Sequence, residues 1–427
     1  MTAREVALNT LYKIEVGEGY SNITLDKELN KHDLSKLDKA LASEIVYGVL
    51  TWKIKLDAII KRYSSIRLKK ISPWIINILR IGIYQIAFLD KIPESAAVNE
   101  SVKLAKRYGH EVSSKFVNAI LRKIEKNECE KLAEYLDSLS ITEEEKISTL
   151  TSHPLWIVEK LIDEYEDIEF VKELLNSNNI TPEVTIRVNT LKANREEVKR
   201  LLELKNVDCR FGNCPDSIIM KNFFMLDESL AIVQDEAAQL ACLKLEPNEN
   251  EKVLDACSSP GGKTTYISQL MNNTGRIDAW DIHEHRVLLV KQIAEKLGCT
   301  NIKASQKDAS EYHTECREKY DKVLLDVPCS GLGVIRKKPD IKWTRNKEDI
   351  AELVEIQKNI LECGAQYLRS GGTLVYSTCT VLKEENEYQI KKFLNKYSEF
   401  ELVEEIKLFP NIDGTDGFYI AKMRKNI

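Results

Sequence analysis

Two cysteine residues in the C-terminal half of the chain each close a segment that predicts a buried strand. The segment KVLLDVPCS, residues 322–330, places Cys329 just past its apolar run, and GGTLVYSTCT, residues 371–380, does the same for Cys379. Parallel strands of an open α/β sheet carry reactive side chains at their carboxyl ends, so both thiols could face one crevice. Either cysteine alone is better explained as a buried structural thiol. The pair, with Asp326 beside Cys329, favours chemistry by a thiolate nucleophile.

A glycine turn lies upstream of both cysteines. In KVLDACSSPGGKTTYISQL a predicted strand, Val253–Ala256, meets the turn Pro260-Gly261-Gly262, and a helix begins near Lys263. Such a turn lets backbone N–H groups approach a ligand at the N-terminus of a helix. The spacing fits neither GxGxxG nor a Walker A loop, so the glycines alone are also explained by a tight structural turn.

The stretch from Lys252 onward repeats a strand, a loop and a helix, which predicts a doubly wound parallel sheet. Its second strand, RIDAWD, ends on Asp281, 26 residues after Asp255, where a ribose hydroxyl pair would be held in this architecture. The third strand, around Ile302–Ser305, is followed by Asp308. Each acid alone is more often a surface cap than a ligand. Acids at the ends of successive strands together describe a bound adenosine.

The remainder of the chain is helical at first and mixed in the middle. The helical periodicity and the breaks between periodic runs predict an all-α bundle over residues 1–127, a charged helical connector over 128–150, a small α+β subdomain over 151–245 and a catalytic domain over 246–427. Within the subdomain, VTIRVNTLKAN predicts a strand whose polar side carries Arg187 and Asn189, either exposed or in contact with a ligand. The stretch IVQDEAAQLACL, residues 232–243, predicts a helix.

Composition and charge are those of an ordinary folded protein, with 43% hydrophobic and 30% charged residues. Residues 1–127 hold 22 Lys and Arg against 14 Asp and Glu, a net charge of +8, while the whole chain carries −5. A basic part joined to an acidic remainder is a hint of nucleic-acid contact. The ten cysteines are widely spread and contain no CxxC pair, which predicts neither a disulfide scaffold nor a zinc site. Without an apolar signal or spanning segment, we expect a cytoplasmic protein that does not enter a membrane.

Several of these stretches resemble one family. DACSSPGGKT is similar to the S-adenosylmethionine loop DxCAAPGGKT of the RNA cytosine-C5 methyltransferases, and RVNTLK resembles the subdomain that precedes their catalytic domain. ILRIGIYQIAFLDKIPESAAVNESVKLAKRYG and KFVNAILRKI resemble the antitermination factor NusB, and more closely the NusB-like domain fused to certain rRNA methyltransferases. The combination resembles the 16S rRNA (cytosine-C5) methyltransferases of the RsmB type. It implies a NusB-like bundle, an α+β subdomain and a Rossmann-like class I methyltransferase domain.

The resemblance also implies a reaction, the transfer of methyl from S-adenosylmethionine to C5 of a cytosine in 16S rRNA. Cytosine C5 is a poor nucleophile, and a thiolate added to C6 turns it into an enamine carbon that can attack the methyl group. Cys379 is then the nucleophile, Cys329 assists breakdown of the adduct, and Asp326 pairs with N3 and the amino group. Lys263 is expected near Asp326 and sets its charge.

The cofactor contacts that the resemblance implies are the glycine loop, the acids at the strand ends and one arginine. These are Ala256, Cys257, Ser258, Ser259, Pro260, Gly261, Gly262, Lys263, Asp281, Arg286, Asp308 and Asp326. Ser258 and Ser259 replace the small apolar pair that is usual in the family, which leaves the backbone role of the loop intact.

Basic residues in two places are the candidate RNA contacts. In the NusB-like part they are Arg4, Lys103, Lys106, Arg107, Lys115, Arg122 and Lys123, and in the stretch GLGVIRKKPDIKWTR they are Arg336, Lys337, Lys338 and Arg345. Basic residues interleaved with Trp343 suit a single-stranded or flipped-out base. A solvated charged surface is the alternative for each of them.

Two other functions fit the same residues. One is a cytosine-C5 methyltransferase for tRNA, since the catalytic residues do not distinguish the RNA. The other is an RNA-binding antitermination or assembly factor that retains an inert methyltransferase fold. The intact set of acids and cysteines argues against the inert protein. We expect a monomer.

Overall fold

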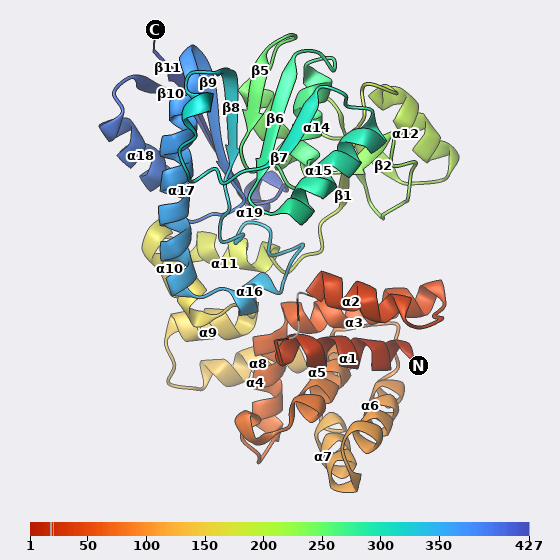
Figure 1. Cartoon of the computed structure of the whole chain (residues 1–427). Coiled ribbons are helices and arrows are strands. Elements are labelled where there is room, and N and C mark those ends of the chain that lie inside the picture. The colour runs from red at the N-terminus through yellow and green to blue at the C-terminus, as the bar shows by residue number, and fades with distance from the viewer. Residues whose placement is uncertain (18, 20, 427) are drawn as a thin grey trace. The chain divides into compact units, whose positions relative to one another are not determined.

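The computed structural model describes residues 1–17, 19 and 21–426, which divide into two units (Figure 1). The first unit contains Met1–Asn179 and the separate segment Lys338–Thr344. The second contains Ile180–Lys337 and Arg345–Ile427. Among the described helices, none combines the length and the apolar character that a membrane span needs.

The first unit is helical throughout. Its helices are α1 (Ala3–Glu15), α2 (Ser21–Asn30), α3 (Lys36–Thr51), α4 (Lys53–Tyr63), α5 (Pro73–Phe88), α6 (Glu94–Tyr108), α7 (Glu111–Leu121), α8 (Glu128–Asp137), α9 (Glu143–Thr151), α10 (Leu155–Tyr165) and α11 (Ile168–Ser177), with the short helix α16 (Ile341–Thr344) from the separate segment. The helix α5 begins at Pro73, where the missing N–H costs nothing, and most of its residues are buried in the core. The predicted all-α bundle is confirmed.

A small antiparallel sheet opens the second unit. Its strands are β1 (Val184–Val188), β2 (Cys209–Phe211), β3 (Ser217–Met220) and β4 (Ala231–Val233), in the order β2-β3-β1-β4, with α12 (Arg195–Leu204) packed against it. The helix predicted for residues 232–243 is wrong at its start. Residues 231–233 pair with β1 as β4, and α13 (Glu236–Leu245) begins only after Asp235, whose Oδ1 accepts the N–H of Ala237 at 3.0 Å.

The large sheet has seven strands in the order β10-β11-β9-β8-β5-β6-β7 (Figure 1). They are β5 (Lys252–Asp255), β6 (Arg276–Asp281), β7 (Ile302–Gln306), β8 (Tyr320–Asp326), β9 (Leu368–Thr378), β10 (Phe400–Leu408) and β11 (Phe418–Lys425). The neighbours from β9 to β7 are parallel, and β11 pairs antiparallel with both β9 and β10. The chain moves outward from β5 in both directions, which creates a switch point and a crevice at the carboxyl ends of β5 and β8.

Both faces of this sheet are covered, as the apolar alternation requires. In β8, Val323 and Leu325 join the core formed with α17 (Lys347–Tyr367), whereas Leu324 joins the core formed with α13 and α14 (Gly262–Leu270). The helices α15 (Glu284–Leu297) and α18 (Glu387–Lys396) complete the layers. The predicted doubly wound Rossmann-like domain is therefore confirmed.

Candidate active site

The structure brings the two predicted thiols into contact. The strands β8 and β9 are parallel neighbours in which Asp326 lies opposite Ser377, so the residues just beyond their ends lie at one height in the crevice. The Sγ atoms of Cys329 and Cys379 are 3.2 Å apart. Both residues are free thiols and partly exposed. The distance is that of a hydrogen-bonded pair of sulfurs.

Asp326 lies at the end of β8 and has two partners. Lys263 Nζ donates to its Oδ2 at 2.7 Å, and the Ser377 hydroxyl donates to its Oδ1 at 2.9 Å. Burial lowers the pKa of the Lys263 ammonium, but the Asp326 carboxylate outweighs this effect, and the pKa is raised above its ordinary value. The lysine is therefore charged at neutral pH, and the carboxylate is held in one orientation at the edge of the crevice.

The two sulfurs have different charged neighbours. The field of Cys379 contributes to the raised pKa of Lys263, so the Cys379 sulfur lies within range of a positive charge. The hydrogen bond with Cys379 and burial raise the pKa of the Cys329 thiol, and the carboxylate of Glu385 raises it further. A positive charge therefore lies within range of the Cys379 sulfur, whereas the carboxylate of Glu385 lies within range of the Cys329 sulfur.

The glycine loop after β5 adopts the tight turn that the sequence predicts. Gly261 has a φ of +106° and caps α14, and a Cβ at this position would lie 2.5 Å from Ile293 Cγ2. A side chain is thus excluded both by the left-handed backbone and by the helix packed behind the loop. The first N–H groups of α14 remain available at the crevice edge for a ligand.

The acids of the next two strands lie at or just past the strand ends. Asp281 is 7% exposed and its Oδ1 accepts the N–H of His283 at 2.9 Å. Asp308 Oδ1 accepts the N–H of Ser310 at 2.8 Å and its hydroxyl at 2.6 Å. In each case the local bonds fix one carboxylate oxygen, which leaves the other for the hydroxyl or amino groups of a ligand. Arg286, in the first turn of α15, is exposed.

Asp255 lies behind this row of acids and is fully buried. The hydroxyl of Thr264 donates to its Oδ2 at 2.6 Å, while its Oδ1 has no protein partner among the described residues. Burial raises the pKa of this carboxyl to about 7, and the nearby Asp326 adds to the effect. The buried oxygen, the glycine cradle and the acids fit a ligand with a positively charged centre and a ribose, as S-adenosylmethionine has.

A buried arginine supports the loop from the small sheet, and the sequence did not assign it this role. Arg187 of β1 is 1% exposed and donates to Gly262 O, to Thr265 Oγ1 at 3.0 Å and to Gln234 Oε1. Burial lowers the pKa of its guanidinium to about 10. Of the two options left open, exposure is wrong for this residue, which instead fixes the first turn of α14.

Asn189, two residues further along the chain, is also buried. Its side chain donates to Ser229 O at 2.8 Å and to Leu297 O at 2.9 Å, and it accepts from Gln269 at 2.8 Å. The alternation of polar and apolar residues along the strand correctly placed Arg187 and Asn189 on its polar side. The alternation could not show that this side is buried against other parts of the protein.

The candidate RNA residues between the cysteines have different surroundings. Arg336 has a side chain only 7% exposed and pairs with Asp416 at 3.2 Å, and Lys337 pairs with Asp235 and Asp416 at 2.5 and 2.7 Å. Their charges are matched within the protein. Lys338 is exposed, and Arg345 is partly exposed and donates to Ser330 O at 3.2 Å. Lys338 and Arg345 therefore remain the better placed of the four to meet RNA.

The aromatic residue of this stretch is not on an open surface. Trp343 Nε1 donates to Leu50 O at 2.8 Å, and its ring packs against the core of the first unit. Lys342 is 1% exposed, and its ammonium donates to Thr51 O and Ser152 O at 3.2 Å and to Asn179 Oδ1 at 2.7 Å. Trp343 is thus engaged by protein, which disagrees with its interpretation as a stacking platform for a base.

In the helical unit, two of the candidate RNA residues lie on the surface and have acidic partners. Lys106 and Arg107, in the last turn of α6, have side chains 64% exposed, and they pair with Glu111 at 3.7 Å and with Glu5, respectively. Exposed ion pairs of this kind contribute little to stability and can be exchanged for a phosphate contact.

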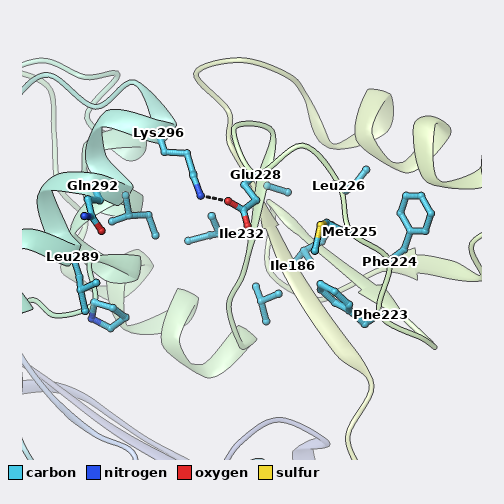
Figure 2. Close-up of a pocket in the computed structure, with 14 residues that line it drawn as sticks. Ile186, Phe223, Phe224, Met225, Leu226, Glu228, Ile232, Leu289, Gln292 and Lys296 are labelled. Carbon is cyan, nitrogen blue, oxygen red and sulfur yellow. Dashed lines mark hydrogen bonds and ion pairs between the residues drawn. The ribbon is translucent and has the colours of Figure 1, made fainter. Parts of the chain in front are cut away.

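A hollow outside the crevice lies in the second unit (Figure 2). Its volume is about 350 Å³, and the small sheet, the loop that precedes β4 and α15 form its walls. The lining is mostly apolar, with Phe223 and Met225 on one side and the ion pair of Glu228 with Lys296 at its edge. It includes Pro260 of the glycine loop, but neither thiol and none of the acids Asp255, Asp281, Asp308 and Asp326, and it is distinct from the crevice described above.

Three family models match the chain. The model described as 16S rRNA methyltransferase RsmB/F matches residues 242–424, the NusB family model matches residues 1–126, and a ferredoxin-like domain model of RsmF/B-like methyltransferases matches residues 153–226. The three matched ranges follow one another along the chain and cover the helical bundle, the small sheet and the large sheet.

Relatives match over the full length. A probable ribosomal RNA small subunit methyltransferase B of Bacillus subtilis (strain 168) is 37% identical over 99% of both chains. The crystal structure of PH0851 superposes with a TM-score of 0.81 at 28% identity over 98% of both chains. A methyltransferase homologue from Pyrococcus horikoshii has a TM-score of 0.60 at 26% identity and covers 67% of this chain and 100% of its own. The chain belongs to the 16S rRNA methyltransferase RsmB/F family, whose cofactor is S-adenosylmethionine.

Proposed function

We propose that this protein methylates C5 of a cytosine in 16S rRNA through a covalent adduct between Cys379 and C6 of the base. The observation that carries the proposal is the pair of sulfurs 3.2 Å apart beside Asp326, at the carboxyl ends of neighbouring strands. Methyl transfer to an oxygen or to an exocyclic nitrogen needs no thiol, because those atoms have lone pairs. A carbon that is a poor nucleophile does need one.

The steps balance with the groups present. The Cys379 thiolate adds to C6 and forms the S–C6 bond, while N3 takes up one proton from water beside Asp326. C5 then forms its bond to the methyl carbon as the bond from that carbon to the sulfonium breaks. Loss of the C5 proton to water restores the C5–C6 double bond and expels the Cys379 thiolate, and the N3 proton is released. The Cys329 thiol, as a hydrogen-bond donor to that sulfur, stabilises the departing charge.

Asp326 and Lys263 act together at the pyrimidine edge. The carboxylate accepts from N3–H and the exocyclic amino group of the base, and it stabilises the positive charge that the ring develops. Lys263, at 2.7 Å, and Ser377, at 2.9 Å, hold the carboxylate in place before the substrate arrives. Preorganised charge of this kind lowers the barrier without reorganisation during the reaction.

S-adenosylmethionine supplies an electrophilic methyl group on a positively charged sulfur. The chain positions it with the loop from Ala256 to Lys263, whose glycine turn opens the helix N-terminus, and with Asp281 for the ribose hydroxyls and Asp308 for the adenine amino group. The contacts that fix one oxygen of each of these two acids support these roles.

Ribosomal RNA as the substrate is supported by two independent features. The curated relative from Bacillus subtilis is named for the small ribosomal subunit and matches end to end, and the first 126 residues match the NusB family. The net charge of +8 over residues 1–127 suits a polyanion. A tRNA methyltransferase would be expected to share the catalytic residues but not this front part.

The roles of the thiols are tested with two variants. Cys379→Ala should abolish both methyl transfer and adduct formation, because no sulfur remains to attack C6. Cys329→Ala should retain addition and transfer but slow release, so that a protein–RNA species stable to denaturing electrophoresis accumulates. Accumulation of this species with Cys379→Ala instead would show that the roles are exchanged.

The substrate is tested by methyl transfer from radiolabelled S-adenosylmethionine to unmodified 16S rRNA and, separately, to unmodified tRNA, followed by nucleoside analysis. We expect label in 5-methylcytidine from rRNA alone. Label in 5-methylcytidine from tRNA alone would support the proposed methylation of cytosine C5 but refute 16S rRNA as the substrate. Label in another nucleoside would refute the chemistry.

A further inference from the structure

A hydroxyl bridge joins the two loops immediately beyond the thiols. Ser330 follows Cys329 and Thr380 follows Cys379, and their hydroxyl oxygens are 2.8 Å apart. Both residues are buried, at 0% and 1% exposed. The bridge fixes the spacing of the two loops one residue from each sulfur, so the short distance between the thiols depends on what lies beneath it.

Beneath the bridge lies the buried carboxylate of Glu385. It is 0% exposed, and its Oε1 accepts the N–H of Ser330 at 2.8 Å and the amide of Gln357 at 2.9 Å, while its Oε2 accepts the Ser330 hydroxyl at 2.5 Å. Tyr376 OH donates to the backbone carbonyl of Glu385 at 2.6 Å, which fixes the residue itself. Three donors thus converge on one buried carboxyl group and fix its orientation.

The charge of Glu385 is placed asymmetrically with respect to the two sulfurs. Its hydrogen bonds run to Ser330, on the loop of Cys329, and reach Thr380 only through the hydroxyl of Ser330. Other titratable and charged groups near the pair include Asp326, Lys263, Cys257, Tyr376 and Arg345. Lys263 lies on the Asp326 side, within range of Cys379, and Arg345 donates to Ser330 O.

We propose that Glu385 is a positioning residue that makes the two thiols unequal: it holds the Cys329 loop against the Cys379 loop and keeps the shared proton on Cys329, so that Cys379 carries the negative charge. This inference rests on the proposed function, in which Cys379 attacks the base. It explains how the enzyme avoids an adduct through the wrong sulfur, since two thiols 3.2 Å apart would otherwise compete for one base.

The ionisation of each thiol can be read directly from alkylation. The full-length protein is treated with iodoacetamide between pH 6 and pH 10, and the initial rate at each cysteine is followed by peptide mass spectrometry. In the wild-type protein Cys379 should react with an apparent pKa lower than that of Cys329. The same apparent pKa for both, or the reverse order, would overturn the proposal whatever the variants do.

Glu385→Gln removes the charge and keeps the shape. The apparent pKa of Cys329 should fall by roughly one to two pH units, the effect of a nearby like charge. Glu385→Asp keeps the charge and should leave the pKa of Cys329 closer to that of the wild type. The matched control is Glu236→Gln, because Glu236 is also buried, at 6% exposed, and accepts the N–H of Cys214 and the Ser217 hydroxyl, each at 2.7 Å.

The outcomes separate charge from shape. An unchanged Cys329 profile in Glu385→Gln would overturn the proposal, as would a fall of the same size in Glu385→Asp or in Glu236→Gln. If Glu385→Gln does not fold, the order of the two thiols in the wild-type protein decides alone. Alkylation uses neither RNA nor methyl transfer, so a failure of the proposed rRNA substrate would leave this result unaffected, and a failure here would leave the methylation assay intact.

Discussion

Arg187→Met tests whether the small sheet positions the cofactor loop. The substitution keeps the apolar stem of the side chain and removes a guanidinium that is 1% exposed and donates to Gly262 O, Thr265 Oγ1 and Gln234 Oε1. Gly262 and Thr265 belong to the first turn of α14, which directly follows the glycine loop. The variant therefore removes a tie to the loop without touching a residue that would meet the ligand.

The expected loss of stability in Arg187→Met depends on which acceptors of the guanidinium keep another hydrogen-bond donor. Gly262 O still accepts from the Thr265 hydroxyl at 3.1 Å, and that hydroxyl still donates to Gly261 O at 2.8 Å. Gln234 Oε1 is the acceptor that loses its only described partner, and one buried acceptor without a partner costs about 1–3 kcal/mol. Loss of the guanidinium stacked 4.8 Å from the Tyr266 ring adds to this, while removal of an unpaired buried charge offsets part of it. We expect a net loss of about 2 kcal/mol.

Calorimetry gives the first measurement. A loss of about 2 kcal/mol should lower the thermal midpoint of the second unit by roughly 4–8 °C. If all of this energy is lost from holding the loop in its binding conformation, the Kd for S-adenosylmethionine should rise by about 30-fold. An unchanged Kd would refute the positioning role even if the midpoint fell.

A surface arginine of the same sheet provides the control. Arg210 pairs with Glu183 on the surface, and their side chains are 59% and 41% exposed. Arg210→Met should change stability by less than about 1 kcal/mol and leave the Kd unchanged, because exposed ion pairs contribute little. A similar rise in Kd for both variants would indicate a general effect of lost positive charge.

Three further predictions concern other parts of the chain. Gly261→Ala should weaken S-adenosylmethionine binding more than tenfold in calorimetry, because its φ is +106° and the new Cβ would lie 2.5 Å from Ile293 Cγ2. The backbone strain and the overlap each cost about 1–3 kcal/mol. Gly298→Ala is the control, because Gly298 is also left-handed, at +77°, but its new Cβ would make ordinary contacts, and the Kd should not change. Asp255, with a folded pKa of about 7 against an ordinary 3.8, holds a proton that the unfolded chain releases. The contribution of this proton to the free energy of unfolding is fully present below about pH 4, and up to about 4 kcal/mol is lost as the pH rises through about 7. In urea titrations, the free energy of unfolding of Asp255→Asn should depend less on pH than that of the wild-type protein. The same pH dependence in both proteins would contradict the raised pKa of Asp255. Lys342→Met should destabilise the helical unit by about 2 kcal/mol in urea unfolding, since it removes the hydrogen bonds to Thr51 O, Ser152 O and Asn179 Oδ1, and equal stability would contradict a stabilising role for these bonds.

The sheet and the residues at its strand ends were predictable because their signals are local. Apolar runs of strand length, glycine turns and acids recur with regular spacing, and parallel strands place their carboxyl ends at one edge. That rule correctly put Asp326, Cys329 and Cys379 together. The start of α13 was missed for an equally local reason. Residues 231–233 are too few to give a strand pattern, and they became β4 only because β1 offered a free edge.

The residues that the sequence left unassigned or misplaced have polar partners that lie far along the chain. Lys342 and Trp343 occur in a basic stretch, which read alone predicts an RNA contact, yet their partners are 163 to 293 residues away. The Lys342 side chain donates to Thr51 O and Ser152 O, at the C-terminal ends of α3 and α9, and to Asn179 Oδ1, and burial lowers its pKa well below the ordinary value. Glu385 was overlooked in the charged run KEENEY, which is typical of a solvated helix start. Only the packing of Ser330, Gln357 and Tyr376 around it shows that it is buried.

Two parallel strands that end side by side bring the residues beyond their ends close together, and that proximity is a problem for a site with two thiols. Either sulfur could reach the same base, so position alone cannot assign one to attack and the other to assist. Charge breaks the symmetry: Lys263 is near Cys379, and Glu385 is tied to the loop of Cys329. Exchange of the two roles would therefore require moving the charges and not the cysteines. For this reason a variant at Glu385, which touches neither sulfur, tests the division of labour more directly than deletion of either thiol.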